Sequence, residues 1–346
     1  PISFLLEKRP PSLPVMREKR TPMSARTALL LPLLCALAAF TAPDARADKF
    51  PSRAIEIILP AAAGGTTDTA LRLMAARWQE FLGQPVVVVN VPGAGGAIGA
   101  NRAARAKPDG YTLLSGFDSL LVALPFVQKT VEYNLESFEY LMGYGLGALY
   151  FSVRSESPYM TMPDLIKAAK ANEGKLNYGS YGIGVITHFA AERLWQLNGV
   201  KMSYVPYKSS PETVFSLLGG HIDVAVTAGA GPAAKNPKVR ILPVAGDQRR
   251  PDQPDVPTLK ELGYPVSLDF IAGVLAPKGL PPEVRETLVT AFRKAHEKYG
   301  AEMKQQIESK ADLLYVSMPG EQVKDTWRER QSWFKEVAAS MKLNPQ

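Results

Sequence analysis

The chain has 346 residues, of which 46% are hydrophobic, 21% charged and 9% aromatic, and its formal net charge is +7. This composition excludes a disordered or collagen-like chain, and the length provides a core for one large or two medium domains. The single cysteine, Cys35, excludes a disulfide framework and any multi-cysteine metal site. Histidine occurs only at three separated positions, His188, His221 and His296, so we expect no metal site and no cofactor.

The amino-terminal segment has the layout of a secretory signal peptide. Residues 23–47 read MSARTALLLPLLCALAAFTAPDARA, in which a basic start precedes an apolar run of 13 residues and the small-residue exit Ala45-Arg46-Ala47. The apolar run is too short for a permanent membrane anchor. We therefore expect export with cleavage near Ala47. Because the chain starts without Met and Met23 is a well-placed start, we interpret residues 1–22 as a non-native extension.

Most of the positive charge lies in this discarded part. The first 47 residues contain seven Lys or Arg and three acidic residues, so cleavage would lower the net charge from +7 to +3. The remainder has no basic cluster beyond Arg249-Arg250, and no stretch of 18 apolar residues occurs in the chain. We expect neither nucleic-acid binding nor stable membrane insertion of the mature chain.

Strand and helix patterns alternate along the rest of the sequence. The run AIEIIL over 54–59 predicts a strand, the loop AAAGGTTD follows, a helix begins near Thr67 and stops at Gly83, and PVVVVN predicts a second strand. A second unit repeats this order. Its predicted elements are strands over 149–153, 176–178 and 222–226, helices that begin at Thr161 and Ser210, and a helix over 189–197. A strand over 270–276 and helices over 282–299, 301–310 and 320–341 complete the chain. This succession predicts parallel sheets flanked by helices.

One loop in each unit lies between a strand and a helix, where exposed backbone N–H groups and the helix dipole favour an anion. In the loop over 61–68, two glycines let the backbone approach a ligand and two threonines add hydroxyls, while Asp68 is badly placed to touch an anion and is better suited to order the loop. The loop over 179–188 has the same placement. A plain strand-to-helix turn is the alternative for the first loop, and a structural role is the alternative for His188.

Enzyme motifs do not match. Tyr178 stands where a nucleophile elbow around Ser180 needs glycine, Thr187 stands where a dinucleotide fingerprint needs glycine or alanine, and Tyr207 precedes Lys208 where a phosphate-binding loop needs glycine. No catalytic residue is therefore predicted.

Several motifs together resemble the Bug family, the periplasmic solute receptors of tripartite tricarboxylate transporters. They are FPSRAIEIILPAAAGGTTDTALRLMA, GQPVVVVNVPGAGGAIGANRAARAKPDGYTLL, LNYGSYGIGVITHFAAERL, VPYKSSPETVFSLLGGHIDVAV, RRPDQPDVPTLKELGYP and LAPKGLPPEV, in order over 48–346. The resemblance implies an α/β fold with two lobes, the periplasmic binding protein fold of class II type. Each lobe would be a mixed, mostly parallel sheet flanked by helices, with a ligand cleft between the lobes. We expect residues 48–148 and 273–346 in the first lobe and 149–272 in the second.

The resemblance also implies a site in which both loops hold a ligand carboxylate through amides, hydroxyls and bridging waters. The expected ligand-binding residues are Ala62, Ala63, Gly65, Thr66, Thr67, Asp68, Ser180, Tyr181, Gly182, Gly184, Thr187, His188 and Tyr207. The chain departs from the usual family pattern at Ala61, Val185, Ser209 and Phe270.

The implied function is periplasmic binding of a small organic carboxylate and its delivery to the membrane components of the transporter. The alternative is a sensory partner that presents the ligand to a membrane signalling receptor. An exported hydrolase is a third possibility, which the failed motif checks disfavour.

Overall fold

Short runs of buried aliphatic residues form the centres of two β-sheets. The structure, a computed structural model, describes residues 49–229, 236–250 and 253–341. The expected signal peptide, its cleavage site at Ala47 and Cys35 all lie outside the described residues.

The first sheet has the strand order β11–β4–β10–β3–β1–β2. Its strands are β1 (Ile55–Leu59), β2 (Val86–Asn90), β3 (Thr112–Phe117), β4 (Phe138–Gly147), β10 (Phe270–Pro277) and β11 (Leu314–Pro319). β1 pairs in parallel with β2 and β3, whereas β10 and β11 pair antiparallel with their neighbours. In β1, four of the five residues are buried, as a strand covered on both faces requires.

The second sheet has the order β7–β6–β8–β5–β9. Its strands are β5 (Leu149–Arg154), β6 (Asn177–Ser180), β7 (Ser203–Pro206), β8 (Val224–Ala228) and β9 (Val239–Val244). β6 is parallel to β7 and β8, and β5 is antiparallel to β8 and β9. Both sheets are thus mixed, and the expectation of mostly parallel sheets is wrong in this detail. The physical reason is that β4 passes directly into β5, and that no helix of the described residues lies between β9 and β10, so these connections do not impose the parallel pairing that a helical crossover gives.

Helices cover the sheets as the apolar spacing predicts. They are α2 (Thr66–Leu82), α3 (Ala97–Ala104), α4 (Leu124–Val127), α5 (Met162–Ala171), α6 (Ile186–Leu197), α7 (Ser210–Leu218), α9 (Pro282–Ala311) and α10 (Gly320–Ser340). Thr161 caps α5 in a capping box with Asp164, which confirms the predicted helix start. The two helices predicted on either side of Gly300 are instead the single helix α9, which packs Phe292 on Trp78 of α2 with ring centroids 4.4 Å apart. One glycine within a helix that is otherwise packed against neighbours weakens it without ending it.

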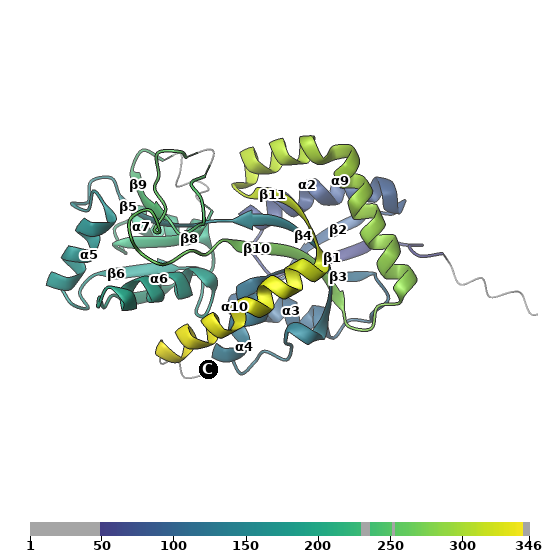
Figure 1. The fold of residues 1–346 in the computed structure, drawn as a ribbon, viewed down its shortest axis with the longest axis horizontal. Coiled ribbons are helices and arrows are strands. Elements are labelled where there is room, and N and C mark those ends of the chain that lie inside the picture. Colours follow the sequence, from purple (N-terminus) through teal and green to yellow (C-terminus); the bar gives the residue numbers. More distant parts are fainter. Residues whose placement is uncertain (1–48, 230–235, 251–252, 342–346) are drawn as a thin grey trace, which may run out of the picture. The chain divides into compact units, whose positions relative to one another are not determined.

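The chain passes between the sheets at two places. β4 ends at Gly147 and β5 begins at Leu149, and the return runs from β9 to β10. Figure 1 shows β4 and β10 side by side on this path, with α10 running along them. We call the first sheet with α2, α3, α4, α9 and α10 the first lobe, and the second sheet with α5, α6 and α7 the second lobe. We propose lobe boundaries between residues 148 and 149 and, because Phe270 already pairs with Gly147 of the first sheet, at the start of β10.

The expected two-lobed α/β fold class is confirmed by these sheets and by the solved structures described below. Within the described residues, no helix combines the length and apolar character needed to cross a membrane.

Candidate functional site

The loop between β1 and α2 is held in place by a buried carboxylate. Asp68, 4% exposed, accepts hydrogen bonds from the Gly64 N–H at 2.9 Å, from Asn90 Nδ2 at 2.9 Å and from Arg72 Nε at 3.0 Å. Burial alone raises the pKa of Asp68, but the hydrogen bonds from Arg72, Gly64 and Asn90 outweigh it and leave that pKa below its usual value. Asn90 also donates to the Ala61 carbonyl at 3.1 Å. Asp68 therefore orders the loop and does not line the cavity beside it.

The amino-terminal turn of α2 faces that cavity. Gly65 is the N-cap and supplies no side-chain cap, so the first N–H groups of the helix are left for another acceptor. Ala62, Ala63, Gly65, Thr66 and Thr67 all line the cavity. The Thr67 hydroxyl has no hydrogen-bond partner within the described part of the chain. This turn thus offers backbone and hydroxyl donors together, as an anion requires.

The loop between β6 and α6 divides into a cavity-facing part and a supporting part. Tyr181 and Gly182 line the cavity, whereas Ser180, Gly184, Thr187 and His188 are absent from its wall. Of the six residues expected at the site in this loop, two therefore line the cavity and four lie behind its wall, and their roles in ligand binding stay predictions.

The supporting part is organised around Tyr204 of β7. His188, 3% exposed, stacks on the Tyr204 ring with centroids 3.9 Å apart, and its Nδ1 accepts the Gly184 N–H at 3.1 Å. The Tyr204 and Ser180 hydroxyls lie 2.9 Å apart, and the Tyr204 hydroxyl donates to the Gly182 carbonyl. Burial lowers the pKa of His188 to about 3. His188 is therefore neutral and supports the loop, which is the structural role given above as the alternative to ligand binding.

A pH dependence of stability follows from this burial. A histidine whose pKa is depressed in the folded state contributes stability above its unfolded pKa, about 6.5, and that contribution is lost as the pH falls below it. Relative to His188→Gln, we expect the unfolding free energy of the native protein to fall by about 1.4 kcal/mol per pH unit below about pH 6. Urea unfolding between pH 7 and pH 4 measures both slopes. His221→Gln, at an exposed ring, is the control and should keep the native slope; equal slopes for the native protein and His188→Gln would contradict the burial argument.

A third segment, between β7 and α7, adds the polar groups that the sequence left out. Tyr207 lines the cavity, as expected. Lys208, Ser209, Ser210 and Pro211 also line it, although the sequence did not assign them to the site. Ser209 caps α7 by accepting the Glu212 N–H at 3.3 Å, and the Glu212 carboxylate accepts the Lys208 N–H at 2.9 Å. The signal for this segment was the run KSSPE, a helix start directly after a strand.

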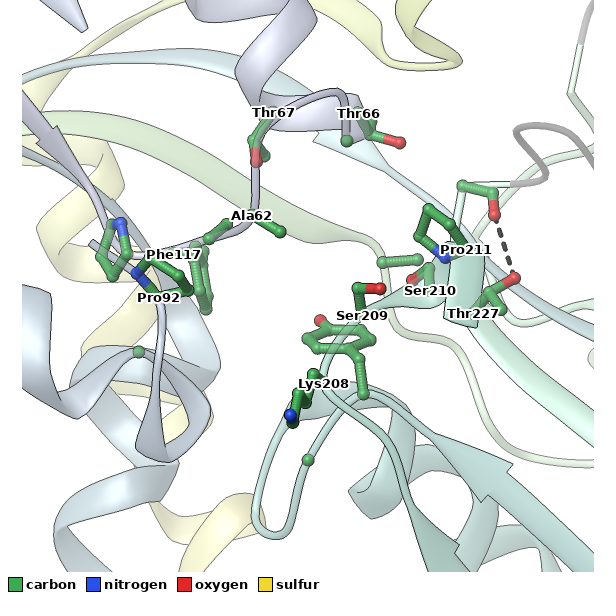
Figure 2. A pocket seen from close by; sticks show the side chains of 18 of the residues that line it. Ala62, Thr66, Thr67, Pro92, Phe117, Lys208, Ser209, Ser210, Pro211 and Thr227 are labelled. Carbon is green, nitrogen blue, oxygen red and sulfur yellow. Dashed lines mark hydrogen bonds between the residues drawn. The ribbon is translucent and has the colours of Figure 1, made fainter. Parts of the chain in front are cut away.

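These segments enclose one cavity with a volume of about 1440 Å³. Figure 2 shows Ala62, Thr66 and Thr67 of the first lobe on one side and Lys208, Ser209 and Ser210 of the second lobe on the other. The volume exceeds the roughly 300–1,000 Å³ usual for small-molecule sites. Much of the wall is apolar, and these residues are Ala61, Pro92, Ala94, Phe117, Val127, Ile183, Ile186, Pro206, Val214 and Phe270. A cleft of this size and lining fits a small ligand with an apolar body and polar ends.

Contacts between the lobes border the cleft. The Gln128 side chain donates to the Ile183 carbonyl at 3.4 Å, and a Cβ built on Gly184 would lie 2.3 Å from Val127 Cγ2. Elsewhere on the wall, a Cβ on Gly229 would lie 2.4 Å from the Thr66 hydroxyl oxygen. The lobes thus touch closely where glycine leaves room, so closure of the cleft is sensitive to added side chains there.

The loop over 93–96 and the end of α9 over 308–312 also line the cleft, although the sequence did not assign them to it. Within the described ranges, no group of three or more His, Cys, Asp or Glu side chains is arranged to hold a metal ion. The charged residues on the wall are Lys208, Glu308, Lys310 and Asp312.

Comparisons with known proteins agree with this geometry. The family described as "Tripartite tricarboxylate transporter family receptor" matches residues 70–316. A UPF0065 protein of Cupriavidus necator is 40% identical over 280 residues, which are 80% of this chain and 83% of that protein. Protein BugT of Bordetella pertussis is 33% identical over 267 residues, 75% of this chain and 81% of its own.

Solved structures show the same fold. The periplasmic binding protein BugD has a TM-score of 0.77 at 27% identity, with 86% of this chain and 100% of that chain covered. An R. palustris protein solved with adipate has a TM-score of 0.79 at 26% identity over 86% and 100% of the two chains. MatC of Rhodopseudomonas palustris, solved with bound malate, has a TM-score of 0.74 at 26% identity over 84% and 100%. The resemblance inferred from the motifs is confirmed, and the chain belongs to the tripartite tricarboxylate transporter receptor family of periplasmic solute-binding proteins.

Proposed function

We propose that this protein binds a small organic carboxylate in the cleft between its lobes and delivers it to the membrane components of a tripartite tricarboxylate-type transporter. The observation that carries the proposal is the uncapped start of α2, which presents free N–H groups and the Thr67 hydroxyl to the cleft. Two structural neighbours, solved with adipate and with malate, hold ligands of this class.

The mechanism follows from the placement of the loops. One carboxylate oxygen would accept from the first turn of α2 and from Thr67, while the backbone at Tyr181 and Gly182 faces the ligand from the second lobe. Bridging waters can complete the remaining contacts at little loss of enthalpy. The cavity is larger than such a ligand, so capture requires the lobes to approach one another. Movement at the two chain crossings, 147–149 and 245–269, would bring them together.

The proposal extends to location and chemistry. We propose that the protein acts in the periplasm after cleavage near Ala47, and that it is a receptor without catalytic activity. Family membership supports both statements. The cleft wall also supports the second, because within the described chain its only acidic residues, Glu308 and Asp312 at the end of α9, are accompanied on the wall by no His or Cys.

A thermal-shift screen of mono-, di- and tricarboxylates tests carboxylate binding. A ligand at 100 times its Kd that binds only the folded state adds about 2.7 kcal/mol of stability, which raises the melting temperature by several degrees. Titration calorimetry of the best acid then gives the affinity. No stabilisation by any acid, or turnover of an ester or amide by the purified protein, would overturn the proposal.

Thr67→Val tests the position of the carboxylate. The change keeps the β-branched shape and deletes one donor, so a carboxylate oxygen is left unpaired in a closed cleft. We expect affinity to fall by about 5- to 150-fold, corresponding to roughly 1–3 kcal/mol. The melting temperature should change little, because the hydroxyl makes no internal hydrogen bond among the described residues. Thr326→Val, on the exposed face of α10, is the control. Native affinity in Thr67→Val would place the carboxylate elsewhere.

A further inference from the structure

The second lobe presents a single charge to the cleft. Among the described residues that line its side of the cavity, from Tyr181 to Gly229, only Lys208 is ionised. The others are aromatic, aliphatic, hydroxyl-bearing or glycine residues. Lys208 lies across the cleft from Pro92 and Phe117, next to Ser209 (Figure 2). One wall of the ligand site therefore carries an uncompensated positive charge.

Within the described part of the chain, the ammonium group of Lys208 has no carboxylate partner. No ion pair within 4.0 Å involves Lys208 among the described residues, although Glu212 stands four residues later. The Glu212 carboxylate is directed to the backbone instead, where one oxygen accepts the Lys208 N–H at 2.9 Å. A lysine held by its backbone with its ammonium group unpaired is available to a ligand anion.

The other lysine of the cleft, Lys310, has charged neighbours on the wall. Lys310 lies near the end of α9, and the same stretch places Glu308 and Asp312 on the wall. Lys310 thus shares its stretch of the wall with acidic side chains, and Asp312 also lies 3.9 Å from the guanidinium group of Arg250. Lys208 is thus the only cation in the described cleft whose neighbours on the wall are all uncharged.

Apolar groups line much of the cleft that contains both Lys208 and the turn of α2. Ala62, Pro92, Phe117, Ile183 and Val214 occupy the walls of the cleft and offer no side-chain hydrogen bond to a ligand. The cleft therefore has two places that attract an anion, the turn of α2 and Lys208. The apolar walls suit the hydrocarbon part of a ligand that reaches both.

We propose that Lys208 is a specificity-determining residue that pairs with a second acidic group of the ligand, so that the cleft selects dicarboxylates over monocarboxylates. The inference rests on the proposed function, since it takes the first carboxylate to lie at the turn of α2. A charge-assisted hydrogen bond formed in a closed cleft is expected to favour the second acid group by about tenfold or more in Kd.

Matched ligand pairs test this selection. Titration calorimetry of each unbranched diacid from butanedioate to octanedioate, against the monoacid with the same number of carbons, gives a diacid-to-monoacid affinity ratio for each length. We expect the native protein to prefer at least one diacid by about tenfold or more. In Lys208→Gln that ratio should fall below about threefold, with monoacid affinity within about twofold of native, and Lys208→Arg should retain the preference.

Lys170→Gln is the matched control, because it removes an exposed lysine of α5 in the second lobe that does not line the cleft, and it should leave the ratio unchanged. A diacid preference that survives in Lys208→Gln, a preference lost equally in Lys170→Gln, or no diacid preference in the native protein would overturn the inference while leaving carboxylate binding intact. If no acid of either kind binds, the proposed function itself fails and the inference fails with it. Melting curves of all variants verify that they are folded.

Discussion

We expect Arg330→Met to lower the unfolding free energy by about 3–5 kcal/mol at pH 7, because it leaves a fully buried carboxylate without its partner. Asp118, 0% exposed at the end of β3, accepts from Ser119 N–H at 2.8 Å and pairs with Arg330 of α10. Arg330 also donates to the Asp269 carbonyl at 2.6 Å, just before β10. The pair thus joins the end of β3 and α10 of the first lobe to the segment that leads into β10 from the second lobe.

The loss should depend on pH in a defined direction. Burial raises the pKa of Asp118, and Arg330 offsets part of this rise. Without the guanidinium group, the folded protein keeps a proton that the unfolded chain releases above about pH 4. The stability of Arg330→Met relative to the native protein therefore decreases as the pH rises from the folded pKa of Asp118 in the native protein to its higher folded pKa in the variant, and it is nearest to native in acid.

Urea unfolding at several pH values measures the effect. The control is Arg328→Met, on the same helix, whose partner Glu136 is more than half exposed, and it should lose far less stability than Arg330→Met. The double variant Asp118→Asn/Arg330→Met removes both charges and should recover part of the loss. A loss in Arg330→Met no larger than in Arg328→Met, or one that does not grow with pH, would contradict the account.

Local signals in the sequence explain which elements could be predicted. The β1 run IEIIL, the glycine pair after it and the box from Thr161 to Asp164 each act through neighbours in the chain. Strand β4 escaped prediction because its sequence, FEYLMGYGLG, contains three glycines, and glycine weakens strand propensity. The glycines are there for partners far along the chain. A Cβ on Gly145 would lie 2.1 Å from Leu313, and one on Gly147 would lie 2.0 Å from the Phe270 ring.

The same distinction between local and long-range signals applies to the candidate site. The loops after β1 and β6 could be found because a strand, a glycine-rich turn and a helix start follow one another in the sequence. Which side of a loop meets the ligand could not, because the Tyr204 ring from β7 turns Ser180 and His188 away from the cleft. The end of α9 gave no signal at all, since its contact with the cleft depends on how a distant helix packs. The strand β11 after it, which lies between two predicted helices and was not itself predicted, is held by pairing with β4.

The second large effect concerns the contact between the lobes at Gly184. This residue has φ of +74°, and a Cβ would lie 2.3 Å from Val127 Cγ2 of α4. Gly184→Ala should therefore lower the unfolding free energy by about 2–5 kcal/mol, the sum of a left-handed backbone and an overpacked contact.

Two further variants separate these causes of the Gly184→Ala loss. Gly199 has φ of +60° in the same lobe, and a Cβ at this position would have nothing within 4 Å, so Gly199→Ala should show the backbone effect alone, about 1–2 kcal/mol. Val127→Ala removes the clashing methyl groups. In that background, Gly184→Ala should lower the unfolding free energy by roughly 1–3 kcal/mol less, because the overpacked contact is gone. Chemical unfolding of the four variants completes a double-mutant cycle with its control. Equal losses for Gly184→Ala and Gly199→Ala, with no coupling to Val127, would mean that the lobes do not press together at this point.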